Sequence, residues 1–201
     1  LTPEGSGYRA KTRFARFYNL PELMAMFKEV ADIKTADMLD LPVPKAIFHN
    51  ISVKPSEHQK QMVAELAERA EKVRNGMVDA SVDNMLKITT DGRKAALDLR
   101  LVEPKASFTF NSKVARCAEN IYEIYCRTAE DKCSQLVFCD SSTPKLDLNI
   151  YDELKRLLVD MGIPSNEIAY VHDATTDKKR SELFKKVSKG EIRILIGSTQ
   201  K

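Results

Sequence analysis

The sequence predicts an α/β fold, with a parallel sheet and flanking helices in the second half of the chain after a mostly helical first half. The composition changes near residue 105, where stretches rich in Ala, Met, Glu and Lys give way to short apolar runs. Three such runs, 135–139, 168–171 and 192–196, are typical of buried parallel strands. Amphipathic stretches separate them, so we expect right-handed crossovers and a sheet covered on both faces.

The N-terminal part predicts one helix and one strand. Leu20 and Pro21 begin the helix, because proline suits the first turn. Residues 41–44 (Leu-Pro-Val-Pro) then enforce an extended segment, since a residue before proline avoids the helical region. Residues 46–53 alternate apolar and polar side chains, a pattern typical of a strand.

Further helices are expected along the rest of the chain. Ser56 and Gln59 have the spacing of a capping box, which begins a long helix that ends near Gly76. Two shorter helices, 82–87 and 94–101, are separated by a predicted break at Gly-Arg-Lys. The α/β half contributes three more, over residues 113–125, 151–161 and 178–187.

Composition and cysteine spacing restrict the class of protein. Hydrophobic residues make up 43% and charged residues 30%, enough apolar material for a packed core. The 4 cysteines form no C-x-x-C pair, which argues against a zinc ribbon or a disulfide framework and favours reduced thiols in a cytoplasm. No apolar run is long enough to span a membrane, and no basic-then-apolar leader opens the chain. The net charge of +3 neither requires nor excludes a nucleic-acid partner.

Three loops after the predicted strands carry the candidate functional residues, because function in parallel α/β sheets collects beyond the carboxyl ends of the strands. The loops are 140–145 with Ser141, Ser142 and Thr143, 172–176 followed by Arg180, and 197–201 with Ser198 and Thr199. Small hydroxyl residues with free backbone N–H groups suit phosphate oxygens, whether of a nucleotide or of a nucleic-acid backbone.

The order of these pieces resembles the second motor lobe of superfamily-two helicases, which has a RecA-like fold. The shared pattern is an apolar strand ending in a hydroxyl loop, a histidine followed by Arg, Phe and Gly, and a strand ending in Ser-Thr. It is carried here by residues 135–143, His172, Arg180, Phe184, Gly190 and 193–199. Asp173 stands where the family pattern has glycine, which weakens a close backbone approach there.

The first half resembles the connector between lobes in the Swi/Snf-like branch, on residues 41–45, 54–59 and 112–113. The segments 12–44, 92–94 and 197–201 are similar to very large helicase-methylase proteins of bacterial mobile elements and phages. The resemblance spans nearly the whole chain. It implies a first-lobe tail and linker over 1–45, a strand plus helical connector over 46–110, and an incomplete RecA-like lobe over 111–201.

The resemblance implies an ATP-dependent helicase or translocase of bacterial or phage origin that acts on duplex DNA in the cytoplasm. The residues that would contact DNA are Ser141, Ser142, Thr143, Arg180, Ser198 and Thr199. The other implied partners are the first lobe in the same polypeptide and a linked DNA methylase. Residues 46–53 would add a strand to the sheet of the second lobe.

The chain lacks the parts that would bind ATP and magnesium. It holds no G-x-x-x-x-G-K-[ST] loop and no acidic box at a strand end. It opens at Leu1 without an initiator methionine and stops at Lys201 soon after a predicted strand, so we expect a fragment of a longer protein. Phosphoryl transfer needs positioning between two lobes. We therefore expect ATP and Mg²⁺ to bind the full-length protein, no catalytic or metal-binding residue here, and no ATP hydrolysis by this chain alone.

Other interpretations of the same residues stay open. The hydroxyls of 141–143 are equally suited to cap the next helix, and Arg180 to pair with Asp177 or Glu182 at the surface. The basic side chains of the first half form either a DNA-facing strip or a solvated helical face; they are Arg9, Lys11, Arg13, Arg16, Arg93, Lys94 and Arg100.

Two other functional classes compete with the DNA motor. Cys139, at a strand end, resembles the nucleophile of cysteine phosphatases and sulfurtransferases. The following loop holds no glycine, and its basic residue is Lys145 rather than arginine, so a buried core thiol is the preferred interpretation. The second class is a non-enzymatic α/β module that binds nucleic acid or a partner protein through the same loops.

Overall fold

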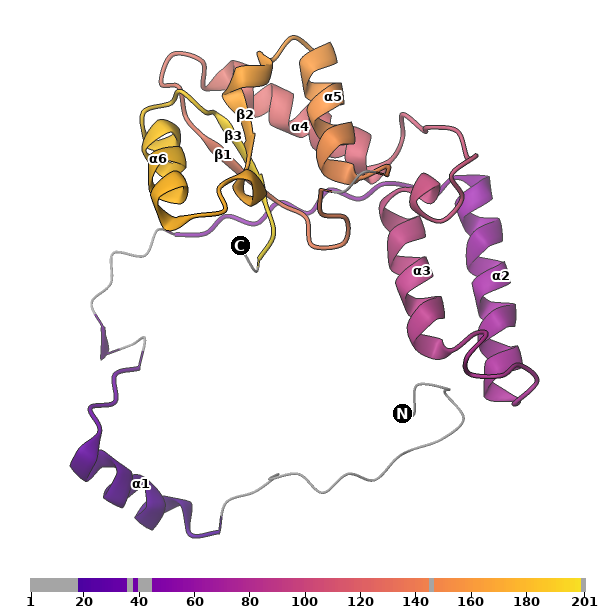
Figure 1. Ribbon diagram of the computed structural model, residues 1–201, viewed down its shortest axis with the longest axis horizontal. Coiled ribbons are helices and arrows are strands. Elements are labelled where there is room, and N and C mark those ends of the chain that lie inside the picture. Colours follow the sequence, from indigo (N-terminus) through magenta and orange to yellow (C-terminus); the bar gives the residue numbers. More distant parts are fainter. Residues whose placement is uncertain (1–17, 36–37, 40–44, 145–146, 200–201) are drawn as a thin grey trace. The chain divides into compact units, whose positions relative to one another are not determined.

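The computed structural model of the protein describes residues 18–35, 38–39, 45–144 and 147–199 (Figure 1). The chain divides into two compact units, with a boundary between Ser52 and Val53. The basic residues up to Arg16, the Pro42–Pro44 segment and the last two residues of the 197–201 loop lie outside the described residues.

The described part of the unit before Val53 contains the predicted helix, α1 (Leu20–Val30), which has Pro21 in its first turn. No residue of α1 is buried. Its large apolar side chains are exposed, namely Leu20, Leu23, Met26, Phe27 and Val30.

The strand predicted over 46–53 was wrong, because residues 45–56 adopt no regular secondary structure. The apolar side chains of Ile47, Phe48 and Ile51 are exposed. A strand requires a neighbour for its backbone hydrogen bonds, and no described strand pairs with this segment. The alternation of apolar and polar residues was therefore not enough to form a strand.

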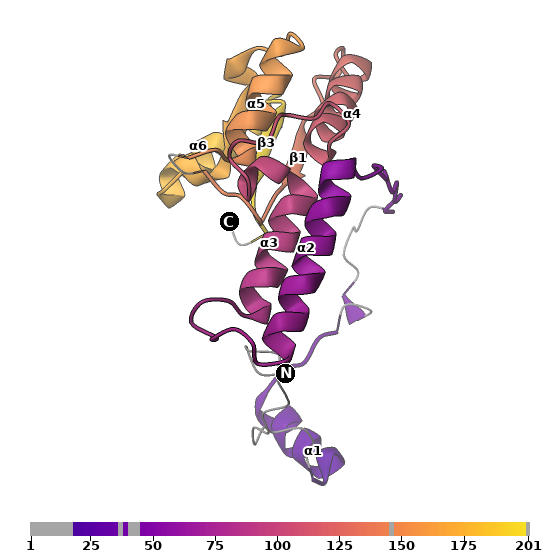
Figure 2. The ribbon, with the colours of Figure 1, turned by 90° about the vertical axis from the view of Figure 1, so that its right-hand side faces the viewer.

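The unit that starts at Val53 begins with two packed helices, α2 (Glu57–Arg74) and α3 (Met85–Leu97), which lie side by side (Figures 1 and 2). The predicted capping box is confirmed: the Gln59 N–H donates to the Ser56 hydroxyl at 3.1 Å, and the Ser56 N–H donates to the Gln59 side chain at 3.0 Å. The pair shares a small core of its own, made of Met62, Leu66, Val73, Ile88 and Ala95.

The break predicted at Gly92 was wrong, because α3 runs through it. A side chain at this glycine would meet the Leu66 side chain of α2 at 3.5 Å, so Gly92 lies at the contact between the two helices. Tertiary packing thus outweighs the low helix propensity of glycine.

Among the described residues, three strands form one parallel sheet in the order β1-β3-β2: β1 (Gln135–Phe138), β2 (Ile168–Tyr170) and β3 (Ile194–Gly197). Helix α4 (Lys113–Arg127) precedes β1, α5 (Ile150–Asp160) connects β1 to β2, and α6 (Asp177–Ser188) connects β2 to β3. The connection from β1 to β2 passes over β3. The connection from β2 then returns in the opposite direction to its neighbour β3. Crossovers of one hand therefore put α5 and α6 on opposite faces, as Figure 1 shows.

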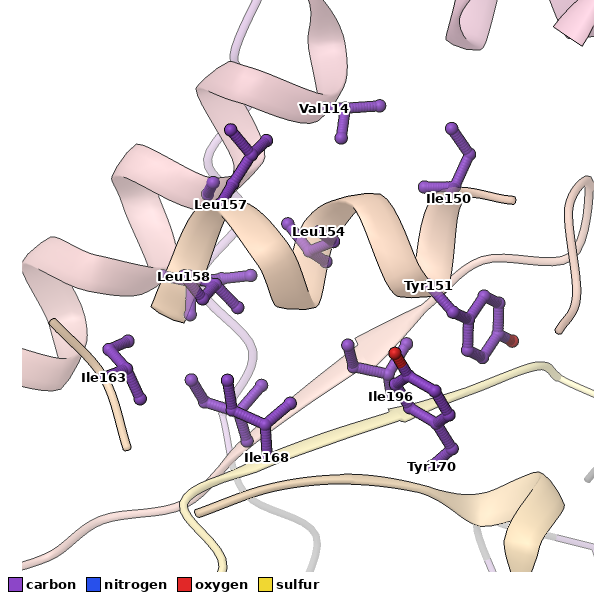
Figure 3. Close-up of a cluster of buried hydrophobic side chains, with 13 residues drawn as sticks. Val114, Ile150, Tyr151, Leu154, Leu157, Leu158, Ile163, Ile168, Tyr170 and Ile196 are labelled. Atoms are coloured by element: carbon purple, nitrogen blue, oxygen red, sulfur yellow. The ribbon is translucent and has the colours of Figure 1, made fainter. Parts of the chain in front are cut away.

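The main core lies between the sheet and the helices α4 and α5 (Figure 3). Tyr151, Leu158, Ile194 and Ile196 are completely buried there. The amphipathic stripe predicted for α4 is largely confirmed, since Val114 and Ile121 are buried and Cys117 and Tyr125 pack against the cluster. The mixed α/β character of this half is thus as the sequence predicts.

The predicted burial of the first strand was wrong. Leu136 is 60% exposed and Phe138 is 62% exposed, whereas Val137 and Cys139 pack against the core. Strand β1, at the edge of the sheet, therefore has one covered face and one exposed face, whereas β3 in the centre is buried along its whole length.

An ionic cluster attaches the helical pair to α5. Arg100 lies 2.7 Å from Asp98 and 3.2 Å from Glu153, and both carboxylates are buried. Burial acts to raise the pKa of Glu153, but its hydrogen bonds to Arg156 and Arg100 outweigh burial and hold that pKa below its usual value. Arg100 also lies 4.7 Å from the centre of the Phe108 ring.

Arg193 joins the start of the sheet to the end of α4. The residue is 4% exposed, and its guanidinium donates to the Tyr125 carbonyl at 2.8 Å and to the Thr128 carbonyl at 3.0 Å. The guanidinium also lies 3.9 Å from the centre of the Tyr125 ring. The Arg193 N–H donates to the Glu167 carbonyl at 2.9 Å, and its own carbonyl accepts from the Gln135 N–H at 2.7 Å.

Replacing Arg193 by alanine is expected to lower the free energy of unfolding by about 3 kcal/mol, because several charge-assisted hydrogen bonds to buried oxygens are lost. Urea denaturation followed by circular dichroism measures the change. The matched control is Arg116→Ala, which removes an exposed ion pair with Glu119 and should cost less than about 1 kcal/mol. Equal denaturation midpoints for the two variants would contradict the structural role of Arg193.

Candidate functional site

A small polar cavity of about 170 Å³ lies beyond the carboxyl end of β1. Its lining residues are Lys94, Leu101, Ser141, Ser142 and Thr143. Lys94 belongs to α3 and Leu101 to the short 3₁₀ turn Leu99–Leu101, so the helical pair forms one wall and the loop after β1 forms the other. Since a water molecule occupies about 30 Å³ of liquid, the cavity has room for several waters or for one tetrahedral anion.

The hydroxyl residues of the loop divide into two roles. Ser142 is 6% exposed, and its hydroxyl accepts a hydrogen bond from the Ile150 N–H at 3.1 Å, at the start of α5. The capping interpretation is therefore confirmed for Ser142. Ser141 and Thr143 are exposed, and their hydroxyls make no side-chain hydrogen bond within the described part of the chain. Two hydroxyls thus face the cavity and can donate to a ligand.

Lys94 provides the positive charge of the cavity. It is half-buried, and among the described residues no carboxylate forms an ion pair with it. The lining contains no acidic side chain. A lysine ammonium beside two free hydroxyls, without a competing carboxylate, is suited to bind a phosphate or another oxyanion.

The sequence suggested that the backbone N–H groups of this loop are free to bind phosphate, but two of them interact with Cys139. The N–H groups of Ser141 and Ser142 act on the Cys139 sulfur and favour its thiolate form. Burial raises the pKa of the Cys139 thiol, and these two N–H groups oppose the rise without cancelling it. Cys139 also packs against the main core. These observations support the interpretation as a core thiol rather than a nucleophile.

A carboxylate clamp connects the loops after β1 and β3. Asp140 accepts a hydrogen bond from the Thr199 N–H at 2.7 Å and from the Thr199 hydroxyl at 3.0 Å. The negative charge of Asp140 beside Thr199 disfavours an anion at that hydroxyl, so this threonine has a positioning role. The neighbouring Ser198 is 7% exposed and offers little surface to a ligand.

Arg180 and His172 do not line this cavity, and their contacts are with other residues. Arg180 pairs with Asp177 at 3.6 Å, and it borders a shallow hollow on α6 with Phe184. The His172 ring packs edge to face against Tyr151, with centroids 5.3 Å apart. The Nε atom of Arg180 and the Nδ1 atom of His172 are buried without a hydrogen-bond partner in the described residues.

The described basic side chains of the first half lie in different surroundings. Arg93 is exposed, whereas Arg100 is held inside the ionic cluster with Asp98 and cannot belong to a DNA-facing strip. Lys94 was included in that strip from the sequence, but its position opposite the hydroxyl loop was not foreseen. Asp140 was overlooked as a partner of Thr199, although an acidic residue directly after a strand is a visible signal.

No group of three or more His, Cys, Asp or Glu side chains in the described ranges is arranged to hold a metal ion. Within the same ranges, every helix is too short or too polar to cross a bilayer. Comparison of the chain with protein-family models, with curated proteins and with solved structures finds no match.

The four thiols are expected to react in two classes with iodoacetamide at about pH 8, just below the usual thiol pKa of about 8.5. Cys126 and Cys133 are exposed and should be labelled first. Burial raises the pKa of Cys117 and Cys139, so at this pH less of each is thiolate, and both should react slowly in the folded chain. Peptide mass spectrometry measures the order. Fastest labelling of Cys139 would instead favour a thiol enzyme.

Proposed function

We propose that this chain is part of an ATP-dependent DNA helicase or translocase of the Swi/Snf-like superfamily-two type, with a RecA-like fold in its second half. In this proposal, the cavity between Lys94 and residues 141–143 receives one phosphate of the backbone of duplex DNA. The observation that carries it is a cavity at the carboxyl end of a parallel sheet where, among the described residues, no acid lines the wall and one lysine and two hydroxyls have no partner. The sequence resemblance supports the same assignment.

Each residue of the site has a separate role in the proposal. Lys94 supplies charge, and Ser141 and Thr143 donate hydrogen bonds to the phosphate oxygens. Ser142 fixes the loop to the start of α5, and Asp140 fixes it to Thr199 after β3. Contacts of this kind position a protein on DNA without reading its sequence.

The two walls of the cavity suggest how DNA contact is coupled to the rest of the protein. One wall belongs to α3 and the other to the loop that precedes α5. The Arg100–Glu153 ion pair, at 3.2 Å, connects the same two parts of the fold. A phosphate bound between them would brace the helical pair against the sheet and pass on a nucleotide-driven lobe closure.

ATP and Mg²⁺ belong to the full-length protein in this proposal. The first lobe of the same polypeptide would supply the phosphate-binding loop and the acidic residues that hold the metal. A linked DNA methylase and a bacterial or phage-derived cytoplasmic setting complete the proposal, and both derive from the resemblance alone.

The Lys94→Gln variant is expected to bind duplex DNA of about 20 base pairs roughly fivefold more weakly at about 0.1 M salt. Its plot of log affinity against log salt should be flatter by about 0.9, the contribution of one phosphate contact. Fluorescence anisotropy at several salt concentrations measures both. The control is Lys72→Gln, an exposed lysine in the last turn of α2. Equal affinities and slopes for both variants would refute the assignment of the cavity.

Purified alone, the chain is expected to release no phosphate from ATP, with or without DNA, because it lacks a phosphate-binding loop. A steady-state phosphate assay measures this, and DNA-stimulated release would contradict the proposal. The full-length protein should show DNA-stimulated hydrolysis. If it binds DNA through Lys94 but never hydrolyses ATP, the function is instead that of a non-enzymatic nucleic-acid-binding module.

A further inference from the structure

An open groove of about 450 Å³ lies between α2, α3 and the start of α4, away from the hydroxyl loop. Most of its exposed lining is apolar. The lining residues on which recognition depends are Lys54, Lys60, Val63, Gly92, Ala96 and Lys113. Its volume lies within the range of about 300–1,000 Å³ that is typical of ligand sites in proteins.

The floor of the groove is apolar and accessible. Val63 lies on α2, as the buried Leu66 does, but the Val63 side chain is 63% exposed. Ala96 is exposed beside it, and Gly92 contributes no side chain to the lining. Covering such a surface removes apolar area from water, which favours binding.

The rim of the groove is positively charged. Lys54 and Lys113 form no ion pair within the described residues, and Lys60 pairs only with the exposed Glu57. Helix α4 begins at Lys113 and has no acidic residue in its first turn. The N-terminus of a helix favours negative charge, so a lysine at this position leaves the positive potential uncompensated.

We propose that the groove binds a segment of a partner protein in which one or two apolar side chains are flanked by carboxylates. The apolar side chains cover Val63 and Ala96, and the carboxylates lie against Lys54 and Lys113. A nucleic acid fits less well, because its phosphates would meet the lysines but leave the apolar floor in water. This proposal does not depend on the DNA contact at Lys94, which lies in a different cavity.

The test uses the whole chain and the fluorescein-labelled peptide Asp-Asp-Leu-Leu-Asp-Asp. Anisotropy is expected to show saturable binding below about 1 mM. Replacing the leucines of the peptide by serine, or its aspartates by asparagine, should each weaken binding by about tenfold or more, since both halves of the recognition are needed. Failure of the parent peptide to bind, or full binding by the asparagine peptide, would overturn the proposal.

Variants of the protein locate the contact. Val63→Glu places a carboxylate on the groove floor and should weaken peptide binding by about tenfold. Leu86→Glu makes the same chemical change on α3, at a residue that is 69% exposed and outside the groove, and should leave binding unchanged. Ala96→Glu, also at an exposed floor position, replaces Val63→Glu if that variant melts earlier than Leu86→Glu. Equal binding by the floor and control variants would overturn the site.

Two further outcomes separate this groove from the proposed DNA site. Lys94→Gln should bind the peptide as the unmodified chain does, whatever its effect on DNA affinity. If duplex DNA displaces the peptide and Val63→Glu weakens DNA binding as strongly as peptide binding, the groove is part of a nucleic-acid surface and the peptide proposal is overturned.

Discussion

The sheet depends on one constraint, the burial of the Arg193 guanidinium. Among the described residues, no carboxylate forms an ion pair with this charge. Burying a charge is costly unless hydrogen bonds replace its hydration. Arg193 obtains them from carbonyl oxygens at the C-terminal end of α4, where the helix dipole is negative. Its backbone meanwhile bonds to Gln135, the first residue of β1, and to Glu167, which directly precedes β2. One residue therefore connects the end of α4 to the segments where the strands start.

The sequence was informative wherever a local pattern and the tertiary contacts agree. The capping box at Ser56, the amphipathic helices around the sheet and the parallel strands formed as their patterns predict. The errors arose where neighbours decide the outcome. Residues 46–53 alternate like a strand but have no strand to pair with, and Gly92 continues a helix because Leu66 packs against it. Likewise, composition cannot show that β1 is an edge strand with only one covered face.

For the candidate site, position along the chain predicted that Ser141 and Thr143 lie at the end of the sheet, because loops after parallel strands converge there. What position does not reveal is which hydrogen-bonding groups are already used. The Thr199 hydroxyl, for example, already donates to Asp140. The approach of Lys94 from a separate pair of helices depends on long-range packing, which no local pattern encodes.

The two hydrophobic clusters have a consequence for the cavity that lies between them. The helical pair is held by a core of five buried side chains, whereas the sheet and its helices share a core of thirteen. Cooperative units of unequal size open with unequal free energies, and the smaller one opens more often. Whenever the helical pair loosens, the lysine wall leaves and the hydroxyl wall stays in place. The cavity is thus only as persistent as its weaker wall, and a ligand that bridges both walls would slow amide exchange in α2 and α3 more than in the sheet.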